Sequence, residues 1–306
     1  MIDISKRFLN SSVLTGVILV AVFVMFGACS DKKGTDSNDE VINRILIDEF
    51  TDWSSTDWIV FNHTRKDTTD SLISGLYLVK PDGSGFRFLF AGRFIAYPSF
   101  SPKGQWITFS YSGQIWKISF DGTQFNTLTE KGSYFPSAWS PEENRIAYNL
   151  RGGDSSGIWI MDSDGGNRRR IIPYGGYPDW LYPDSILYAN YDWAHPIGAL
   201  CIADTSGRFA RIIFDPTGNF AYSYMGNDVH REKRIIVFDP QVPGEFADIW
   251  IINLDGTGLQ RITDFGALHP SFSPDGNRIV YTDSRNGYLW TMNLDGSDKK
   301  QITGIQ

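Results

Sequence analysis

The latter part of the chain carries a module that recurs about every 40 residues, and this repeat restricts the fold more than any other feature. Its clearest copy begins at Phe272-Ser273-Pro274, continues through Ile279-Val280-Tyr281 and Asp295-Gly296, and ends at Gln301-Ile302-Thr303. The Asp residues of the Asp-Gly pairs lie at positions 82, 121, 164, 255 and 295, separated by 39, 43, 91 and 40 residues, and the gap of 91 spans two modules. Repeats of this length are typical of solenoids, propellers and arrays.

Each module has the pattern of four short strands. The first carries aromatic-Ser-Pro in its clearest copies, and an Asp-Gly pair, replaced by Ser206-Gly207 in the fourth module, supplies the turn before the last strand. The second is an apolar run that ends in Phe or Tyr, at Ile59-Val60-Phe61, Ile107-Thr108-Phe109, Ile146-Ala147-Tyr148, Ile186-Leu187-Tyr188, Ile236-Val237-Phe238 and Ile279-Val280-Tyr281. The third carries a side chain that we expect in the core, at Tyr77, Trp116, Trp159, Cys201, Trp250 and Trp290.

Six such modules predict an all-β fold, a six-bladed β-propeller with four-stranded blades that extends over residues 43–306. Packing the sheets radially around a central channel leaves only short, protected strand edges. The closure of the ring stays open between two alternatives, an added outer strand from Arg44-Ile45-Leu46-Ile47 and the chain's own last strand at Lys300-Gln301-Ile302-Thr303. The segment Asn227–Arg234 resembles an insertion before the strand at Ile236.

A family resemblance follows from the last module. Phe272-Ser273-Pro274-Asp275-Gly276, with Arg278-Ile279-Val280-Tyr281 and Met292-Asn293-Leu294-Asp295-Gly296, resembles the WD-like repeat of TolB-like six-bladed β-propellers, and the likeness covers roughly residues 44–303. It implies the propeller fold and a protein partner in the cell envelope, although the same propeller also occurs beside the catalytic domain of prolyl-oligopeptidase-like enzymes. Components of the Tol system carry a further N-terminal domain, and the segment between Cys29 and Asn43 is too short for it, so we do not expect a true Tol component.

The N-terminus has the pattern of an export signal. Lys6-Arg7 precedes an apolar run from Val13 to Ala28, and Cys29 follows Gly27-Ala28, as in a bacterial lipobox. We expect residues 1–28 to be a lipoprotein signal peptide, Cys29 to carry the lipid, and the polar residues 29–42 to be a flexible tether. The alternative is a plain secretory signal or an uncleaved anchor. The lipoprotein interpretation predicts an exported, membrane-anchored protein on the periplasmic or surface side of the cell envelope.

Charge and cysteine content exclude some functions. The formal net charge is −7, which opposes the phosphate backbone of nucleic acids, so we expect no nucleic-acid partner. The two cysteines are Cys29 and Cys201, and with Cys29 lipidated no intrachain disulfide is available. We therefore expect Cys201 to be a buried packing residue.

Catalytic and metal motifs are weak. Gly153-Asp154-Ser155-Ser156-Gly157 fits the nucleophile elbow of α/β-hydrolases, but it falls in the loop between the second and third strands of a module, without the strand-turn-helix setting that the elbow needs. Asp162-Ser163-Asp164-Gly165 has the start of a calcium loop and coincides with an ordinary Asp-Gly turn. The histidines lie in different modules. We therefore assign no catalytic residue, metal site or cofactor.

One set of residues is a candidate binding site. An aromatic residue or His precedes Pro before the inner strand of several modules, and Pro favours an extended backbone in the residue before it. Equivalent positions form a ring in a propeller, so we predict a rim at one mouth of the channel, which would stack on sugars or anchor a peptide. Its members are Tyr97, Phe135, Tyr174, Tyr177, Trp193, His195 and His269. The alternative role of these side chains is packing between neighbouring blades.

These observations favour a non-enzymatic envelope protein that binds or scaffolds another protein or peptide, such as a peptidoglycan-associated lipoprotein. The alternatives are a glycan-active enzyme, either a lyase or a hydrolase, and a glycan-binding lipoprotein, each using the mouth of the channel. An enzyme would need His195, His230 or His269 to converge around a metal, whereas a glycan-binding protein would need only the aromatic rim.

Overall fold

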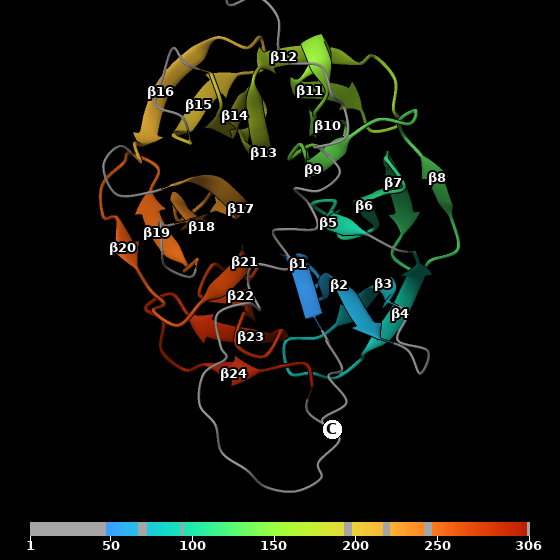
Figure 1. Ribbon diagram of the computed structural model, residues 1–306, viewed down its shortest axis with the longest axis vertical. Helices are drawn as coiled ribbons and strands as arrows, with labels where there is room; N and C mark the ends of the chain where they lie inside the picture. Colours follow the sequence, from blue (N-terminus) through green and yellow to red (C-terminus); the bar gives the residue numbers. More distant parts are fainter. Residues whose placement is uncertain are drawn as a thin grey trace, which may run out of the picture. The chain divides into compact units, whose positions relative to one another are not determined.

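Six four-stranded antiparallel sheets follow one another around a ring in the computed structural model of the chain (Figure 1). The structure describes residues 47–66, 72–92, 95–192, 198–216, 221–241 and 247–304. Each sheet uses four strands that are consecutive in sequence, which confirms the all-β, six-bladed propeller with four-stranded blades. The predicted signal peptide, Cys29, and the tether of residues 29–42 lie outside the described residues.

The strands are short, and each blade runs outward from its first strand. Blades 1 to 3 consist of β1 (Ile47–Trp53), β2 (Ile59–Lys66), β3 (Leu72–Val79), β4 (Arg87–Ala91), β5 (Ala96–Phe100), β6 (Trp106–Tyr111), β7 (Gln114–Ser119), β8 (Phe125–Thr127), β9 (Tyr134–Trp139), β10 (Arg145–Leu150), the 3-10 turn η1 (Gly153–Ser155), β11 (Gly157–Asp162) and β12 (Arg169–Pro173). Blades 4 to 6 consist of β13 (Gly175–Tyr182), β14 (Ser185–Asn190), β15 (Leu200–Asp204), β16 (Phe209–Phe214), β17 (Ala221–His230), β18 (Ile235–Gln241), β19 (Trp250–Asn253), β20 (Gln260–Arg261), β21 (Ala267–Phe272), β22 (Arg278–Asp283), β23 (Tyr288–Asn293) and β24 (Lys300–Gln301).

The Asp-Gly pairs form the turns between the third and fourth strands. Their glycines have φ between 79° and 92°, a left-handed conformation that glycine adopts without steric cost. In blade 6 the Asp295 carboxylate accepts the backbone N–H of Ser297 at 2.9 Å, which closes the turn. Ser206-Gly207 in blade 4 has the same geometry, with φ of 87° at Gly207, and Asp204 accepts the N–H of Ser206. Blade 4 therefore forms the same turn although Ser206-Gly207 replaces the Asp-Gly pair.

The second strand is the buried centre of each blade. Its terminal aromatic residues are buried in all six copies, at Phe61, Phe109, Tyr148, Tyr188, Phe238 and Tyr281. The third-strand column differs from the expectation, because Cys201 is buried but the aromatic residues at the other five positions are only half-buried. These rings cover the sheet and keep one edge in solvent, as the large amphipathic side chains Tyr and Trp commonly do.

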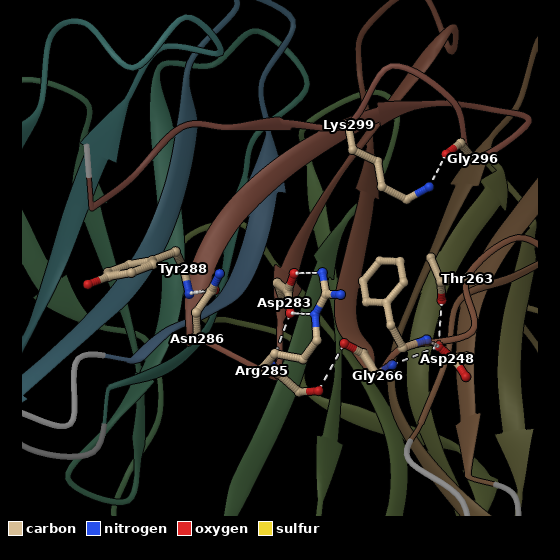
Figure 2. A network of polar contacts seen from close by, with 11 residues as sticks. Asp248, Thr263, Gly266, Asp283, Arg285, Asn286, Tyr288, Gly296 and Lys299 are labelled. Atoms are coloured by element: carbon tan, nitrogen blue, oxygen red, sulfur yellow. Dashed lines mark hydrogen bonds and ion pairs between the residues drawn. The ribbon is translucent and has the colours of Figure 1, made fainter. Parts of the chain in front are cut away.

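The Thr after the fourth strand is a structural part of the repeat. The hydroxyl oxygens of Thr129, Thr263 and Thr303 accept backbone N–H groups of the third-strand segments of their own blades at 2.8 to 2.9 Å. Thr263 also donates to the buried carboxylate of Asp248 at 2.8 Å, and the same carboxylate accepts the N–H of Gly266 (Figure 2). These bonds join the end of blade 5 to the start of blade 6.

Among the described residues, the first and last blades are each built from four strands consecutive in sequence. Lys300-Gln301 forms β24 of blade 6, and Ile47 belongs to β1 of blade 1, while residues 44–46 lie outside the described residues. Asp48 joins the two blades: its N–H donates to the carbonyl of Gly287 at 2.8 Å, and its carboxylate accepts the Thr303 hydroxyl at 2.5 Å. The other carboxylate oxygen lies 2.5 Å from His63 Nδ1. A buried polar cluster therefore holds the first and last blades together.

The segment Asn227–Arg234 of blade 5 is not an insertion. Val229 pairs with Ile236, as Phe272 pairs with Ile279 and Phe100 with Ile107, and the spacing within each pair is the same. The expected insertion over Asn227–Arg234 was wrong because this segment is the end of β17 and its turn, in which Val229-His230-Arg231 stands in place of aromatic-Ser-Pro.

Candidate functional site: the central cavity

A cavity of about 430 Å³ lies at the centre of the propeller and touches the first strand of every blade. Its lining comes from Phe50–Ser55, Tyr97–Pro102, Ser137–Trp139, Tyr177–Asp179, Gly226–Glu232 and His269–Pro274. This is the part of the repeat that contains the predicted aromatic-Pro positions. The cavity is therefore built by equivalent residues from six modules.

A β-bulge shapes the first strand next to the cavity. The register shifts between Glu49 and Asp52 and at the matching places in β5, β13 and β21, and the residue at the bulge has φ of 55° at Phe50, 55° at Tyr97, 51° at Tyr177 and 53° at His269. The expectation of an extended backbone before Pro was therefore wrong. A bulge places two residues opposite one and turns the chain locally, and the left-handed conformation follows from that turn.

The bulge residues gather at one end of the cavity. The ring of Phe50 lies 4.3 Å from that of Tyr97 and 4.3 Å from that of His269, between centroids. Tyr97 of blade 2 also lies 6.3 Å from Tyr177 of blade 4, a contact that passes the first strand of blade 3. The aromatic layer formed by Phe50, Tyr97, Tyr177 and His269 therefore spans the channel. Sequence reasoning missed Phe50, although Phe50-Thr51-Asp52-Trp53 aligns with Tyr97-Pro98-Ser99-Phe100.

Phe135 approaches the aromatic layer from a different register. Ser99 of blade 2 and Ala138 of blade 3 are equivalent, because they pair with equivalent residues of the second strands, Thr108 and Ala147. Two residues before each of them, Pro136 of blade 3 therefore corresponds to Tyr97 of blade 2. Because the proline ring fixes φ near −65°, blade 3 is unable to form the same left-handed bulge. Phe135 lies one residue earlier, 6.2 Å from Tyr97, and the guanidinium of Arg151 lies 4.2 Å from its ring centre.

The predicted rim residues differ in exposure. Tyr177 is 7% and His269 3% exposed, whereas Tyr97 and Phe135 are partly buried and Tyr174, just before β13, is 56% exposed. The structure brings Tyr97, Phe135, Tyr177 and His269 together, and Tyr174 lies at the surface. Trp193 and His195 lie outside the described residues. A ligand would reach Tyr177 and His269 from within the cavity.

Three carboxylates lie at one level of the cavity, next to the aromatic layer. They occupy the same position of the first strand in blades 1, 4 and 5, one residue before Trp53, Trp180 and Val229, which pair with Ile59, Ile186 and Ile236 of the second strands. They are Asp52, Asp179 and Asp228. Blades 2, 3 and 6 have Ser99, Ala138 and Ser271 at this position. Asp52 accepts the N–H of Phe100 at 2.5 Å, and Asp228 accepts that of Phe272 at 2.7 Å, so two of the carboxylates bond to the next blade. Sequence reasoning missed this set, which we call the aspartate level.

Burial and the repulsion of neighbouring carboxylates favour the protonated forms of Asp52 and Asp179. Burial raises the pKa of Asp52 to about 7, and the charge of Asp228 adds to the effect. Burial likewise raises the pKa of Asp179 to about 7, although the Arg231 guanidinium, 3.8 Å away, acts in the opposite direction. On the aromatic side, burial and then the charge of Asp48 raise the pKa of Glu49 to about 7. The cavity is thus rich in carboxylates whose negative charge is poorly compensated.

His269 is buried without a polar partner for its ring. Neither ring nitrogen has a hydrogen bond, and burial lowers the pKa of His269 to about 3, which keeps the imidazole neutral. Its backbone is held, because the N–H donates to the buried carboxylate of Asp239 at 2.8 Å. Asp239 also accepts the N–H of Gly226 at 2.7 Å and so fixes the first strands of blades 5 and 6.

The motifs around Ser155 and Asp164 lie in ordinary turns of the repeat. Ser155 lies in the exposed turn η1 between β10 and β11, and its carbonyl accepts the Trp159 indole N–H. Asp164 accepts the N–H of Gly166 at 2.9 Å in an ordinary turn. Within the described ranges no three His, Cys, Asp or Glu side chains are grouped to hold a metal ion. No helix among the described residues has the length and hydropathy of a membrane span.

Known proteins resemble the chain over part of its length. It is 28% identical over 182 residues to the uncharacterized peptidase YuxL of Bacillus subtilis, covering 56% of this chain and 25% of YuxL. It is 27% identical over 171 residues to the Tol-Pal system protein TolB of Bordetella pertussis, covering 50% of this chain and 36% of TolB. The matched regions thus span between 25% and 36% of the length of these relatives. No family model matches the chain.

Solved structures confirm the architecture. Putative TolB from Agrobacterium tumefaciens superposes with a TM-score of 0.64 at 20% identity, covering 76% of this chain and 89% of that one. An oligogalacturonate lyase from Vibrio parahaemolyticus gives a TM-score of 0.54 at 11% identity, covering 85% of this chain and 78% of that one. Identities this low support the fold alone. Together with the six observed blades, these similarities show that the chain has the six-bladed β-propeller fold of TolB-like proteins.

Proposed function

We propose that this protein is a non-enzymatic module of the cell envelope that binds another protein or a peptide through its central cavity. The observation that carries the proposal is the cavity itself, which all six blades line with aromatic and acidic groups. Similarity to a Tol-Pal system protein supports a protein partner over other ligands. Aromatic side chains provide large contact areas in protein interfaces, and Tyr97, Tyr177 and Phe50 would serve in this way.

Location in the envelope follows from the N-terminal sequence. We propose export, cleavage after Ala28 and lipidation of Cys29, so that residues 29–42 tether the propeller to a membrane. A Cys29→Ser variant is expected to move from the detergent phase to the aqueous phase in a phase-partition experiment and to lose incorporation of a labelled fatty acid. Equal partition of the variant and the wild type into detergent would contradict lipid anchoring at this residue.

Capture from cross-linked envelope tests the binding function. The tagged full chain is compared with a Tyr97→Ala/Tyr177→Ala/His269→Ala variant and a control that removes the exposed side chains of Phe86, Phe88 and Phe125. We expect one protein to be retained by the wild type and the control and lost by the cavity variant, whose fold is checked by circular dichroism. Retention by all three chains would place binding elsewhere, and no specific protein on the wild type would refute the function.

A glycan ligand is the second candidate. The observation in its favour is the shared fold with an oligogalacturonate lyase, combined with the aromatic layer that borders the cavity. Incubation with oligogalacturonate and with peptidoglycan fragments separates the possibilities. Unsaturated products would indicate a lyase, and saturable binding without turnover would indicate a glycan-binding protein. If neither is observed, the protein-binding function stands as proposed.

A further inference from the structure

The cavity is open on the side of the aspartate level that faces away from the aromatic layer. Beyond the three carboxylates its lining continues to the turns after the first strands, where Ser55, Glu232 and Pro274 are exposed. At the other end the rings of Phe50, Tyr97 and Tyr177 reach one another. A ligand that enters from the turns therefore meets Glu232 first, then the aspartates, and finally the aromatic layer.

Acidic groups outnumber basic groups along this path. The lining contains the carboxylates of Asp52, Asp179, Asp228 and Glu232, and Arg231 is its one Lys or Arg among the described residues. Arg231 is already engaged: its Nε donates to the carbonyl of Trp180 at 2.8 Å, and its Nη2 lies 3.8 Å from Asp179. Asp52 and Asp228 each accept a backbone N–H and share the single hydroxyl of Ser271, and none of these partners carries a positive charge.

The same cavity presents an unused acceptor. His269 lines it, is 3% exposed, and has no hydrogen bond to either ring nitrogen. A neutral imidazole has one nitrogen that accepts a hydrogen bond. Buried polar groups normally have partners, so an orphaned ring beside an acidic cavity indicates a donor that comes from a ligand.

We propose that the cavity binds one basic side chain, lysine or arginine, on a partner segment that enters between the turns after the first strands. This inference rests on the proposed binding function and specifies the chemistry of the partner. An ammonium or guanidinium group offers three to five N–H donors, which suits carboxylates contributed by blades 1, 4 and 5. The aliphatic stem of the same side chain would lie along the tryptophan and phenylalanine edges that line the cavity, Trp53, Phe100 and Trp139.

Titration of the cavity carboxylates predicts how the affinity for a basic side chain depends on pH. Asp52 and Asp179 have pKa values near 7: the charge of Asp228 acts on both, Arg231 lies 3.8 Å from Asp179, and the neutral His269 lines the same cavity. A bound cation favours their ionised form, so binding releases protons below neutral pH. Affinity is therefore expected to rise from pH 6 to pH 8, a range in which an arginine ligand keeps its charge.

Isothermal titration with two matched peptides tests the proposal on the full chain. The probes are acetyl-Gly-Arg-Gly-amide and acetyl-Gly-citrulline-Gly-amide, which differ in charge but scarcely in shape. We expect the arginine peptide to bind about tenfold or more tightly, and Asp52→Asn and Asp179→Asn each to weaken it by about tenfold. Asp184→Asn is the matched control, because Asp184 is 87% exposed and lies outside the cavity lining. It should leave binding unchanged.

Three results would overturn the inference: equal affinity for both peptides, no arginine binding at millimolar concentration, or arginine binding that survives both cavity substitutions. Calcium is titrated in parallel, and a calcium site lost in Asp52→Asn without arginine binding would assign the aspartates to a metal instead. Failure of the inference is separable from failure of the proposed function. A partner captured equally by the wild type and by Asp52→Asn would keep the binding function and reject the basic side chain.

Discussion

Replacing Asp52 by Asn is expected to stabilise the protein above neutral pH. In the folded state the Asp52 carboxylate accepts the N–H of Phe100 from the next blade at 2.5 Å and lies 3.3 Å from the hydroxyl of Ser271. An asparagine keeps one carbonyl oxygen in this place, so the bond to Phe100 is retained. The substitution thus removes a charge that burial and Asp228 disfavour, and it keeps the packing of the residue.

The size of the effect follows from proton linkage. The pKa of Asp52 is raised from 3.8 to about 7, so between these values the folded state holds more protons than the unfolded chain and the free energy of unfolding falls as pH rises. At about 1.4 kcal/mol for each pKa unit, the full shift corresponds to about 4 kcal/mol. Water enters the open cavity and screens the charge, and we therefore expect about 2 kcal/mol.

Urea denaturation at pH 5 and at pH 8 measures this difference. Because pH 5 already lies above the unfolded pKa of 3.8, this range covers about two thirds of the shift, and the wild type should lose about 1 kcal/mol more stability than Asp52→Asn. The comparison between chains is needed because Asp179 and Glu49 have similarly raised pKa values and remain in the variant. Asp184→Asn, on the exposed surface, should follow the wild type. The same pH dependence in Asp52→Asn and the wild type, or a variant that is less stable at pH 8, would refute the reasoning.

Four further substitutions test the fold. Asp48→Ala leaves the polar groups that close the ring without a partner, and we expect a loss of about 3 kcal/mol in urea denaturation. Gly207→Ala would place Cβ 1.9 Å from the carbonyl of Ile171 and should cost about 3 kcal/mol or more, whereas Gly153→Ala meets nothing within 4 Å and should cost about 1 kcal/mol, as thermal unfolding will show. Phe109→Ala opens a buried site at a cost of about 4 kcal/mol, and stability equal to the wild type would contradict the core assignment.

Local features of the sequence were sufficient to predict the blades. The turn before each fourth strand depends on one residue with a positive φ, and Gly83 through Gly296 provide it at regular intervals. The second strand depends on a short apolar run ending in an aromatic residue, which packing requires in every blade. Such features need no information about distant parts of the chain, so their repetition along the sequence predicts both strands and blade number.

Closure and the cavity depend on contacts between distant modules. Asp48 contacts Thr303 only when the first and last blades come together, and the sequence near either residue does not predict the contact. The register of Phe135 and the bulge at His269 depend on strand pairing, which the aromatic-Pro pattern does not specify. The aspartate level was accessible from sequence, because Asp52 and Asp179 both precede the Trp that opens their modules.

The residues around the cavity depart from the repeat in ways that packing does not require. Ser99, Ala138 and Ser271 show that a small neutral side chain fits the position that Asp52, Asp179 and Asp228 occupy. Buried carboxylates close to one another destabilise the folded state, and non-glycine residues with positive φ add strain at the adjoining bulges. The same departures occur in different blades and meet at one cavity. Costs of this kind concentrate at functional sites, because a ligand that neutralises the charge recovers the energy, and they support the proposal that the propeller binds its partner on its axis.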